Sequence, residues 1–464
     1  MQHTLLLRPP ARTPSGGGLR VPPLGLAYLA ATLRAQGRRV TLLDALGENL
    51  RWEELPARVA ALQPDVLGLS AMTPVRDVAH RAAKLLREQV DAVVLGGPHP
   101  TAVGSVALSE CPALDFIIQG EGEASFPLLL DALHAHPGPA SSLTHPVPGV
   151  ISRHADGGPA PELDPDALPF PARDLLPNAG YRYPLATRGP ITTLITSRGC
   201  PWRCTFCDQA VTGRRWRERS PDNVLEELAL IVRQGFRYVC IYDDNFTLDT
   251  RRVEDICLGM LRRNIRLDWK CEARVDGVHP ELLQLMARAG CKTIAYGLES
   301  ANQVGLDALK KDSTVEEATR AFRWTRRAGI EIMAYVLLGI PGENPSLARR
   351  TFDFCEREGV SYVQFSTLSA VPGTSLYDEA VQKGWLTGAD IRSPFDDDLE
   401  RATIVAPGWT EESLQQTVQE AWRRFYLHPR FVWRHALRSV RGGQLGAQLR
   451  EGARVLGAWA GQQL

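Results

Sequence analysis

The chain has 464 residues, of which 44% are hydrophobic and 23% are charged, a composition typical of soluble globular proteins. Basic and acidic residues number 53 each, so no net charge attracts nucleic acid or acidic ligands. This length exceeds one ordinary hydrophobic core, and we expect two domains with additions. No apolar run reaches the ~18 residues of a membrane span, and the run before Arg8 is too short for a secretory signal. We therefore expect a cytoplasmic protein without nucleic-acid partners.

Residues 1–135 alternate short apolar runs with amphipathic stretches. The expected strands are His3–Arg8, Arg39–Asp44, Asp65–Ser70, Ala92–Leu95 and Phe116–Gln119. The expected helices are Leu24–Gln36, Trp52–Leu62, Val75–Glu88, Thr101–Ser109 and Ala124–His134. Strict alternation implies an α/β domain with a doubly wound, Rossmann-like sheet, whose ligands bind beyond the carboxyl ends of the strands. Small and polar residues gather at those ends, in segments 70–74, 96–99 and 119–123.

The rest of the chain divides into three parts. Residues 136–185 are rich in Pro, Gly, His and Asp without periodicity, which predicts a linker or wrapping segment. Residues 186–390 resume the alternation, and helical patterns follow the first five of their six expected strands. These strands are Ile191–Ser197, Tyr238–Tyr242, Leu267–Ala273, Thr293–Gly297, Glu331–Leu338 and Tyr362–Ser369. The pattern predicts a partial (β/α)6 barrel with its site on the carboxyl-end loops, followed by a helical extension over residues 391–464.

The cysteines indicate a metal site rather than a disulfide framework, because three of the nine cluster in one loop. Cys200, Cys204 and Cys207 follow the strand expected at Ile191–Ser197, with the spacing C-x3-C-x2-C. Three thiolates this close can converge on one centre, and iron–sulfur clusters commonly use four. With no fourth cysteine nearby, one iron stays open to a substrate or cofactor. The alternatives are unrelated structural cysteines, or a structural zinc site, which would want a fourth Cys or His.

This loop resembles the signature of the radical S-adenosylmethionine (SAM) superfamily, which has the same spacing after the first strand of a partial barrel. The resemblance implies that Cys200, Cys204 and Cys207 ligate three irons of a [4Fe-4S] cluster, while SAM chelates the fourth. Such a centre cleaves SAM reductively to remove hydrogen from unactivated carbon. The cofactor supplies that chemistry, and the protein supplies position and dryness.

The same resemblance implies a SAM site at the ends of the barrel strands. Phe206 matches the aromatic residue beside adenine. Asp243 and Asp244 follow the second strand, where members of the superfamily have groups that accept hydrogen bonds from the SAM amino group. Arg274 follows the third strand and would bind the carboxylate with both nitrogens of its fork. Glu299 and Ser300 close the fourth strand, where Glu299 would take the ribose hydroxyls.

Pattern reasoning leaves simpler roles open for four of these residues. Asp243 and Asp244 could cap the next helix. Glu299 could be a solvated turn residue, and Arg274 could pair with Glu272 or Asp276 on the barrel rim.

A doubly wound domain ahead of such a barrel resembles the cobalamin-binding arrangement of class B radical SAM enzymes. The resemblance implies that hydroxyls and glycine-rich turns at the strand ends hold the nucleotide tail of cobalamin. The matching residues are Ser70, Thr73, Gly96, Gly97, His99, Gly120 and Glu121. Many cobalamin proteins carry a cobalt-ligating histidine in D-x-H-x-x-G after the first strand, but residues 8–14 contain none. His99 is another candidate for a cobalt ligand, although a histidine in a loop more often caps a helix or contacts the nucleotide tail of cobalamin.

These resemblances imply a cobalamin-dependent radical SAM enzyme that functionalises an unactivated carbon, most simply by C-methylation of a small-molecule or lipid-like biosynthetic intermediate. Radical cyclisation, ring rearrangement or adenosyl transfer on a tetrapyrrole, hopanoid or other natural product is the alternative. A non-catalytic protein that binds cobalamin or an iron–sulfur cluster is the competing class. The implied partners are the substrate and an external electron donor such as flavodoxin or ferredoxin.

The C-terminal tail is basic and aromatic, with eight arginines and one acid, Glu451, between Trp422 and Arg454. A basic face with an aromatic rim suits peripheral contact with a membrane surface. A helical cap whose aromatics pack on the barrel and whose arginines are solvated is the favoured interpretation.

Overall fold

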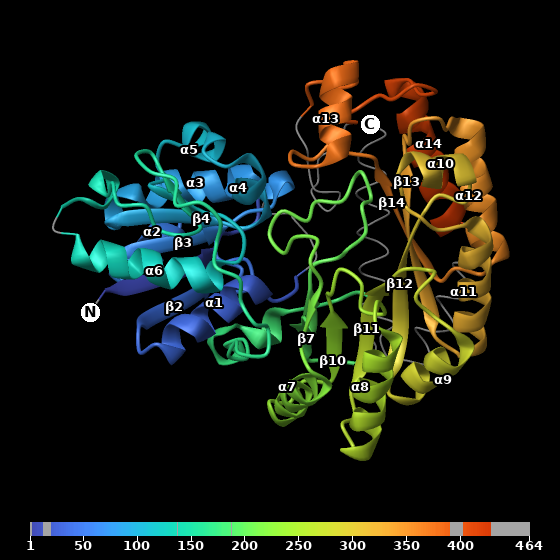
Figure 1. The fold of residues 1–464 in the computed structure, drawn as a ribbon, viewed down its shortest axis with the longest axis horizontal. Helices are drawn as coiled ribbons and strands as arrows, with labels where there is room; N and C mark the ends of the chain where they lie inside the picture. Colours follow the sequence, from blue (N-terminus) through green and yellow to red (C-terminus); the bar gives the residue numbers. More distant parts are fainter. Residues whose placement is uncertain (1, 13–19, 137, 187, 390–401, 428–464) are drawn as a thin grey trace.

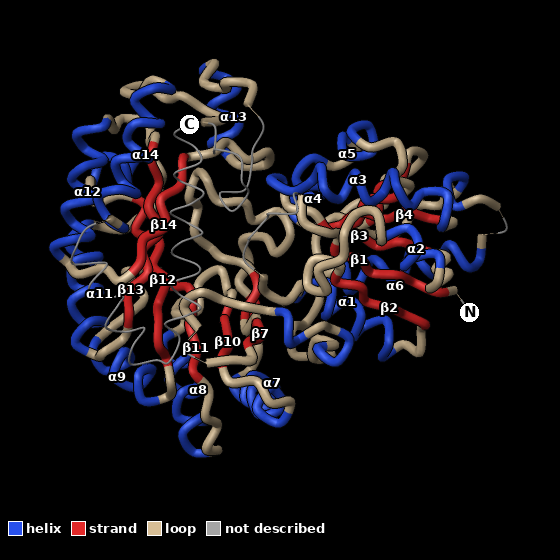
Figure 2. Tube along the Cα trace, turned by 180° about the vertical axis from the view of Figure 1, so that it is seen from behind, coloured by secondary structure: helices blue, strands red, loops and turns tan. Residues whose placement is uncertain are grey.

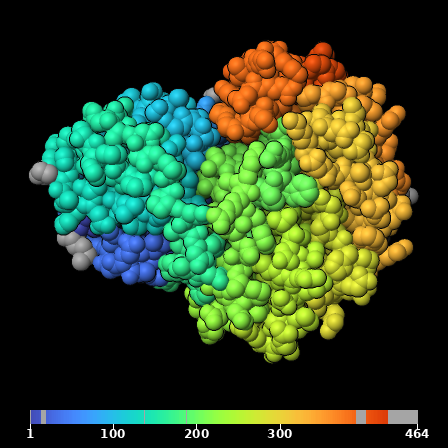
Figure 3. Space-filling view, in the orientation of Figure 1, coloured from blue at the N-terminus to red at the C-terminus, as the bar shows by residue number. Residues whose placement is uncertain are grey.

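The computed structural model describes residues 2–12, 20–136, 138–186, 188–389 and 402–427. They form two α/β units, a front domain and a barrel, which lie side by side in Figure 1. Figure 3 shows the blue and teal front domain packed directly against the green part of the barrel. The expected α/β architecture, with a Rossmann-like domain ahead of a partial barrel and a helical C-terminal element, is confirmed.

The front domain is a doubly wound sheet in the order β2-β1-β3-β4-β5-β6. Its strands are β1 (His3–Arg8), β2 (Arg39–Asp44), β3 (Val66–Ser70), β4 (Ala92–Gly96), β5 (Phe116–Ile118) and β6 (Val150–Ser152). Its helices are α1 (Leu24–Ala35), α2 (Leu55–Ala60), α3 (Arg76–Leu86), α4 (Pro98–Val103), α5 (Val106–Glu110) and α6 (Gly122–Ala135). Both faces of the sheet are covered, so Leu6 packs in one apolar cluster while Leu5 and Leu7 pack in another.

Two details of the front domain differ from the sequence prediction. The helix expected at Thr101–Ser109 is two short helices, because Gly104, with φ +59°, ends α4 and lets the chain turn before α5. The segment expected to be a linker or wrapping element also contributes β6, which pairs antiparallel with β5 and extends the sheet.

The same segment ties the two units together through buried polar contacts. Arg173 is 1% exposed and donates to the Thr192 hydroxyl at 3.0 Å and to the Glu227 carboxylate, both in the barrel. Tyr181 donates from its hydroxyl to Asp44 in the front domain at 2.7 Å. The segment therefore wraps the junction and sets how the two sheets lie against each other.

The barrel is an open, fully parallel six-stranded sheet in the order β14-β13-β12-β11-β10-β7. The strands are β7 (Ile191–Leu194), β10 (Tyr238–Ile241), β11 (Asp268–Ala273), β12 (Cys291–Glu299), β13 (Glu331–Leu338) and β14 (Tyr362–Thr367). Figure 2 shows them curving from β7, beside the front domain, to β14 on the far side. The short strands β8 (Ser197–Arg198) and β9 (Arg217–Glu218) form a separate antiparallel ribbon above β7.

Helices follow the strands and cover the outer face of the barrel, where α8, α9, α11 and α12 lie in Figure 1. The helices are α7 (Pro221–Arg233), α8 (Thr250–Arg262), α9 (Pro280–Arg288), α10 (Gln303–Ala308), α11 (Val315–Arg327), α12 (Pro345–Arg357), α13 (Ser375–Lys383) and α14 (Glu411–Tyr426). Their starts follow from N-capping residues in the sequence, for example Ser220 before α7 and Thr314, with Glu317 in a capping box, before α11.

Helix α14 is the part of the C-terminal tail that the structure describes. Phe425 is 8% exposed and lies 6.2 Å from Phe365 of β14, and Tyr426 donates to the Val363 carbonyl. Arg424 pairs with Asp353 and Glu356 of α12. This part of the tail packs on the barrel as a cap. Residues 428–454 of the predicted basic segment and the predicted boundary at 390/391 lie outside the described residues. No helix among the described residues is long and apolar enough to cross a bilayer.

Candidate functional site

The cysteine loop begins directly after β8 and closes on itself at two glycines. Gly199 has φ +83°, and a Cβ atom there would lie 2.3 Å from the Arg215 carbonyl oxygen, so only glycine fits. Cys200 donates its backbone N–H to the Gly213 carbonyl at 3.3 Å, and Thr205 donates to the Leu309 carbonyl at 3.0 Å. The loop is therefore held at the carboxyl end of the barrel from both sides.

The three thiols form a donor set that suits a cluster better than a single ion. Burial raises the pKa of Cys200 and Cys204, and raises that of Cys207 to about 12. Among the described residues, these three cysteines are not a group already placed to share a single ion. Protonated thiols on a preformed loop lose their protons when iron binds, and these three would hold three irons of a [4Fe-4S] cluster.

Arg274 lies at the end of β11 with its guanidinium 3.9 Å from the centre of the Trp202 ring in the cysteine loop. Its Nε and Nη2 donate to Asp276 at 3.0 and 2.8 Å, which is one of the rim pairs weighed from the sequence. Its Nη1 is buried and has no hydrogen-bond partner among the described residues. One guanidinium nitrogen therefore remains to donate to a ligand beside the cysteine loop.

Asp243 is hydrogen-bonded to the segment that leads into the cysteine loop. It is 1% exposed and accepts from the Thr196 backbone N–H at 2.6 Å and from the Ser197 hydroxyl at 2.7 Å, besides the Thr196 hydroxyl. These bonds replace ladder pairing, which is why the strand expected at Ile191–Ser197 breaks into β7 and β8. Both carboxylate oxygens are used inside the protein, so Asp243 positions the start of the cysteine loop and does not cap α8, which Asp249 caps.

Asp244 faces the same loop from the other side. Its carboxylate accepts from the Gly199 backbone N–H at 3.1 Å and from the Thr212 hydroxyl at 3.3 Å. Burial and the neighbouring Asp243 raise the pKa of this carboxyl group. Asp244 also lines the cavity described below, so it contacts both the cysteine loop and the space between the two units.

Glu299 is not a solvated turn residue, because it is 5% exposed and accepts from Lys311 Nζ at 2.8 Å. Lys311 Nζ also lies 5.8 Å from the centre of the Phe206 ring, next to Cys204. Ser300 instead donates to Glu343, behind this group. Sequence reasoning missed Lys311, which no motif marks. It stands three residues after the end of α10 and would have been found only by asking which cation balances the buried Glu299.

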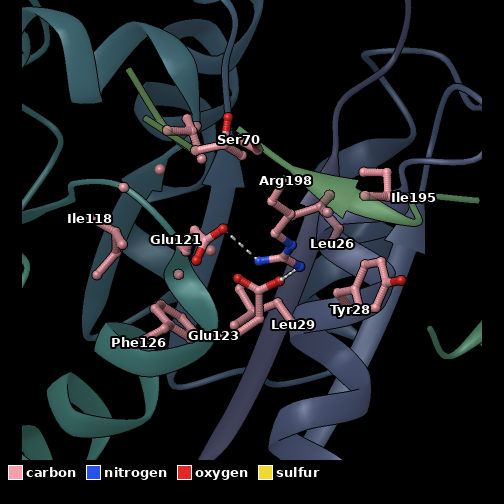
Figure 4. Close-up of a pocket in the computed structure, with 18 of the residues that line it drawn as sticks. Leu26, Tyr28, Leu29, Ser70, Ile118, Glu121, Glu123, Phe126, Ile195 and Arg198 are labelled. Atoms are coloured by element: carbon pink, nitrogen blue, oxygen red, sulfur yellow. Dashed lines mark hydrogen bonds and ion pairs between the residues drawn. The ribbon is translucent and has the colours of Figure 1, made fainter. Parts of the chain in front are cut away.

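A cavity of about 220 Å³ lies beyond the carboxyl ends of the front sheet, where a doubly wound domain binds its ligands. Figure 4 shows it between the front domain and the start of the cysteine loop. Of the residues predicted to contact cobalamin, Ser70, Gly96, Gly97, Gly120 and Glu121 line it. It is also lined by other residues of both units, among them Gly25, Leu26, Tyr28, Leu29, Ile195 and Arg198.

Gly97 is required by its own loop. It has φ +97°, and a Cβ atom there would lie 2.7 Å from Ser70 Oγ and 2.9 Å from the Ala71 carbonyl oxygen. Gly25, on α1, differs because a Cβ atom there would meet nothing within 4 Å. The cavity wall therefore combines a glycine that shapes the backbone with a glycine that leaves open space for a ligand.

Thr73 and His99, which were also predicted to contact cobalamin, are not among the residues that line this cavity. Helix α4 begins at Pro98, and His99 in its first turn contacts Glu110 at the end of α5. His99 is 1% exposed, with Nε2 2.8 Å from Glu110 Oε2 and Nδ1 3.3 Å from Thr73 Oγ1. Both predicted contacts thus belong to a separate polar cluster.

Arg198 joins the cavity wall to the cysteine loop, as Figure 4 shows. Its guanidinium pairs with Glu121 at 3.1 Å and with Glu123 at 2.6 Å, and Arg217 holds Glu121 with two hydrogen bonds of 2.8 and 2.9 Å. Burial would raise the pKa of Glu121, but the pairs with Arg217 and Arg198 hold it below its ordinary value. Because Arg198 immediately precedes Gly199 and Cys200, these ion pairs fix the cysteine loop against the front domain.

Comparisons with known proteins agree with this architecture. The family model of the radical SAM superfamily matches residues 194–355, and that of the B12 binding domain matches residues 17–130. The chain is 30% identical over 433 residues to an uncharacterized methyltransferase, PH0819, of Pyrococcus horikoshii, covering 89% of this chain and 90% of that one. It is 28% identical over 429 residues to the anaerobic magnesium-protoporphyrin IX monomethyl ester cyclase of Rubrivivax gelatinosus, covering 89% and 75%.

A solved structure has the same fold. The radical SAM methyltransferase TsrM from Kitasatospora setae, with cobalamin and a [4Fe-4S] cluster bound, superposes with a TM-score of 0.73 at 20% identity. The match covers 93% of this chain and 90% of that chain. The cysteine loop, the cavity and these matches show that the chain belongs to the cobalamin-dependent radical SAM enzymes. The cofactors of this family are a [4Fe-4S] cluster, SAM and cobalamin.

Proposed function

We propose that this enzyme methylates an unactivated carbon of a small-molecule or lipid-like biosynthetic intermediate. The observation that carries the proposal is the sharing of Arg198 between the cavity wall and the cysteine loop, since methyl transfer needs both cofactors to act on one substrate. When bound, the cofactors supply a carbon-centred radical, which removes hydrogen from the substrate, and a methyl donor. The protein binds them, orients them and keeps water away from the space between them.

The contacts support specific roles around SAM. Cys200, Cys204 and Cys207 would hold the cluster. Arg274, through its free Nη1, would bind the SAM carboxylate, while Phe206 and the Glu299–Lys311 pair would flank the nucleoside. Asp243 and Ser300 act indirectly, by holding the loops that carry these groups, and Asp244 faces the gap between the units.

The contacts also support roles around cobalamin. Ser70, Gly96, Gly97, Gly120 and Glu121 would form the wall against its nucleotide tail, and Gly25 leaves open space on the facing helix. We assign no cobalt ligand, because His99 is turned into a different cluster.

A radical cyclisation is the second candidate function, favoured by the similarity to the R. gelatinosus cyclase. Methylation is preferred, since the chain matches the P. horikoshii methyltransferase at slightly higher identity and over more of that relative's length. Either reaction requires a strong external reductant, which we propose to be a flavodoxin or ferredoxin. We also propose that the enzyme is located in the cytoplasm.

Methyl-labelled SAM tests the choice between the two functions. Anaerobically reconstituted enzyme, given hydroxocobalamin, dithionite and SAM with a trideuterated methyl group, should form S-adenosylhomocysteine and move the label into the cobalamin fraction. It should also form 5′-deoxyadenosine. Deoxyadenosine alone, with all of the label retained in methionine, would contradict methyl transfer and favour cyclisation.

Replacing Arg274 should weaken SAM binding without loss of iron. A charge-assisted hydrogen bond to a carboxylate is worth about 1.5–3 kcal/mol, so Arg274→Ala should bind SAM roughly 10- to 150-fold more weakly. The SAM affinity of Arg274→Lys should lie between those of wild type and Arg274→Ala, because lysine keeps the charge but lacks the planar fork. Equilibrium dialysis on reconstituted protein measures the affinity. Asp276→Asn, which removes the rim partner, should bind SAM normally, and unchanged affinity in Arg274→Ala would mean that the arginine serves only the rim.

Filling the open space at Gly25 should expel cobalamin without disturbing the fold. Gly25→Leu places a branched side chain in the cavity at a helical position where leucine is favoured over glycine by about 0.5–1 kcal/mol. The affinity for hydroxocobalamin should fall at least about tenfold, which corresponds to 1.4 kcal/mol of binding free energy, and less cobalamin should stay with the protein on gel filtration. Gly25→Ala is the matched control and should retain the cofactor. Gly97→Val is a poorer test, since its side chain would collide with Ser70 and Ala71.

A further inference from the structure

A cluster of metal-ligating side chains lies in the front domain, outside the cofactor cavity. His80 on α3, His99 on α4 and Glu110 at the end of α5 bring one ligand atom each within 4.8 Å of one another. The three helices are consecutive in the chain and leave the carboxyl ends of β3 and β4. The cluster is the only such group of His, Cys, Asp and Glu found among the described residues.

The hydrogen bonds of His99 prepare it to bind a metal. Its Nδ1 lies 3.3 Å from the Thr73 hydroxyl oxygen, which can accept a hydrogen bond from Nδ1–H. In this tautomer the Nε2 lone pair faces Glu110 Oε2 at 2.8 Å, and a cation bound between the two atoms would take the place of the Nε2–H···O hydrogen bond of the other tautomer. A hydrogen bond behind a histidine ligand is the usual device that fixes its tautomer and ring orientation.

His80 supplies the third ligand and an independent observation. Its Nε2 atom is buried and has no hydrogen-bond partner among the described residues. The His80 and His99 rings lie edge to face with centres 6.3 Å apart, so they are neighbours that no hydrogen bond joins. One ring nitrogen of His80 lies within 4.8 Å of the ligand atoms of His99 and Glu110, and an ion that all three residues share would explain the unpaired, buried nitrogen on this ring.

We propose that His80, His99 and Glu110 bind a zinc ion, with water in the remaining position. Two imidazoles and one carboxylate are a donor set that zinc accepts at about 2.0–2.2 Å per bond. Glu110 is about one-third exposed, which leaves a path for the ion to enter and for water to complete the coordination. The inference does not depend on the methyl-transfer function.

The ion would stiffen one wall of the cobalamin cavity. His99 stands two residues after Gly97, which lines the cavity and caps α4. Pinning α4 to α3 and α5 would hold the Gly96–Gly97 turn in place. The ion would therefore act through the shape of the cavity wall.

Zinc binding to the reconstituted enzyme tests the proposal while the cluster occupies the three loop cysteines. The protein is freed of loosely bound metal, given one equivalent of zinc sulfate, desalted and measured for zinc content and zinc-edge X-ray absorption. Wild type should hold one zinc per chain with only nitrogen and oxygen ligands, two of them imidazoles. His80→Gln and Glu110→Gln should each lose zinc, and Thr73→Val should bind it about tenfold more weakly, as expected when a hydrogen bond behind a ligand is removed.

His279 provides a matched control. Its ring nitrogens lie 3.6 Å from Glu254 and 3.2 Å from Glu281, so it has histidine and carboxylate donors at an exposed position. His279→Gln should leave the zinc content unchanged. Wild-type zinc no higher than in the double variant His80→Gln/Glu110→Gln would overturn the proposal. A zinc–sulfur distance of about 2.3 Å would overturn it equally, by placing the ion on a cysteine such as the nearby Cys111.

Discussion

Replacing Cys200, Cys204 and Cys207 together by alanine is expected to abolish the iron–sulfur cluster. Reconstituted wild type should hold about four irons and four sulfides, the content of one [4Fe-4S] centre, while the triple variant should hold essentially none. The reason is that the three thiols are the donors that the loop brings to the carboxyl end of the barrel. Iron and sulfide analysis with the absorption spectrum measures the outcome.

The loss should be confined to the cluster. Cys257, on the outer helix α8, is also free and fully buried, and Cys257→Ala should keep the normal iron content. Hydroxocobalamin retention should persist in the triple variant, because its predicted cavity is lined without any of the three cysteines. A triple variant that still reconstitutes a four-iron centre would show that other ligands hold it.

Removing the charge of Arg198 is expected to cost more stability than any exposed ion pair. Arg198→Met leaves Glu123 buried without its cation, and breaking a buried pair in this way typically costs about 3–5 kcal/mol. It should also release the cysteine loop from the cavity wall and weaken cobalamin retention. The urea midpoint of the holoenzyme and gel filtration with hydroxocobalamin measure these two effects.

Two further variants separate the causes. Arg198→Met combined with Glu123→Met replaces the pair by apolar groups and should recover much of the lost stability, since no buried charge stays unpaired. Arg34 and Asp174 form an exposed pair, about half accessible on each side, and Arg34→Met should cost only ~0–1 kcal/mol. If Arg198→Met behaves like Arg34→Met, the ion pairs do not fasten the two units.

The contribution of Glu121 to stability should depend on pH. Arg217 and Arg198 hold the pKa of this carboxyl group in the folded protein below its ordinary value of 4.5. A lowered pKa contributes stability that is fully present above the unfolded-state value and is lost as the pH falls through the folded value. Glu121→Gln should therefore destabilise the enzyme at pH 7 and progressively less below about pH 4.5. Urea midpoints across this range measure the difference, and an equal loss at all pH values would contradict it.

The sequence by itself determined the strands and the cysteine loop. The apolar runs at His3–Arg8, Arg39–Asp44 and Glu331–Leu338 became strands with the same bounds, because their side chains pack on both faces of a parallel sheet. The C-x3-C-x2-C spacing is likewise a local property, since three donors within eight residues lie close together in any compact loop.

The tertiary structure alone decided which side chains meet. Arg198 and Glu123 are 75 residues apart in the chain, and Asp243 and Thr196 are 47 apart, so no local pattern joins them. His99 and Thr73 stand at the predicted strand ends, but in the structure His99 contacts Glu110 of α5 and is not among the residues that line the cavity. The position of a residue at a strand end therefore limits which residues are candidates for binding a ligand. The role of each candidate is decided by its contacts in the folded protein, above all by the partner that neutralises a buried charge.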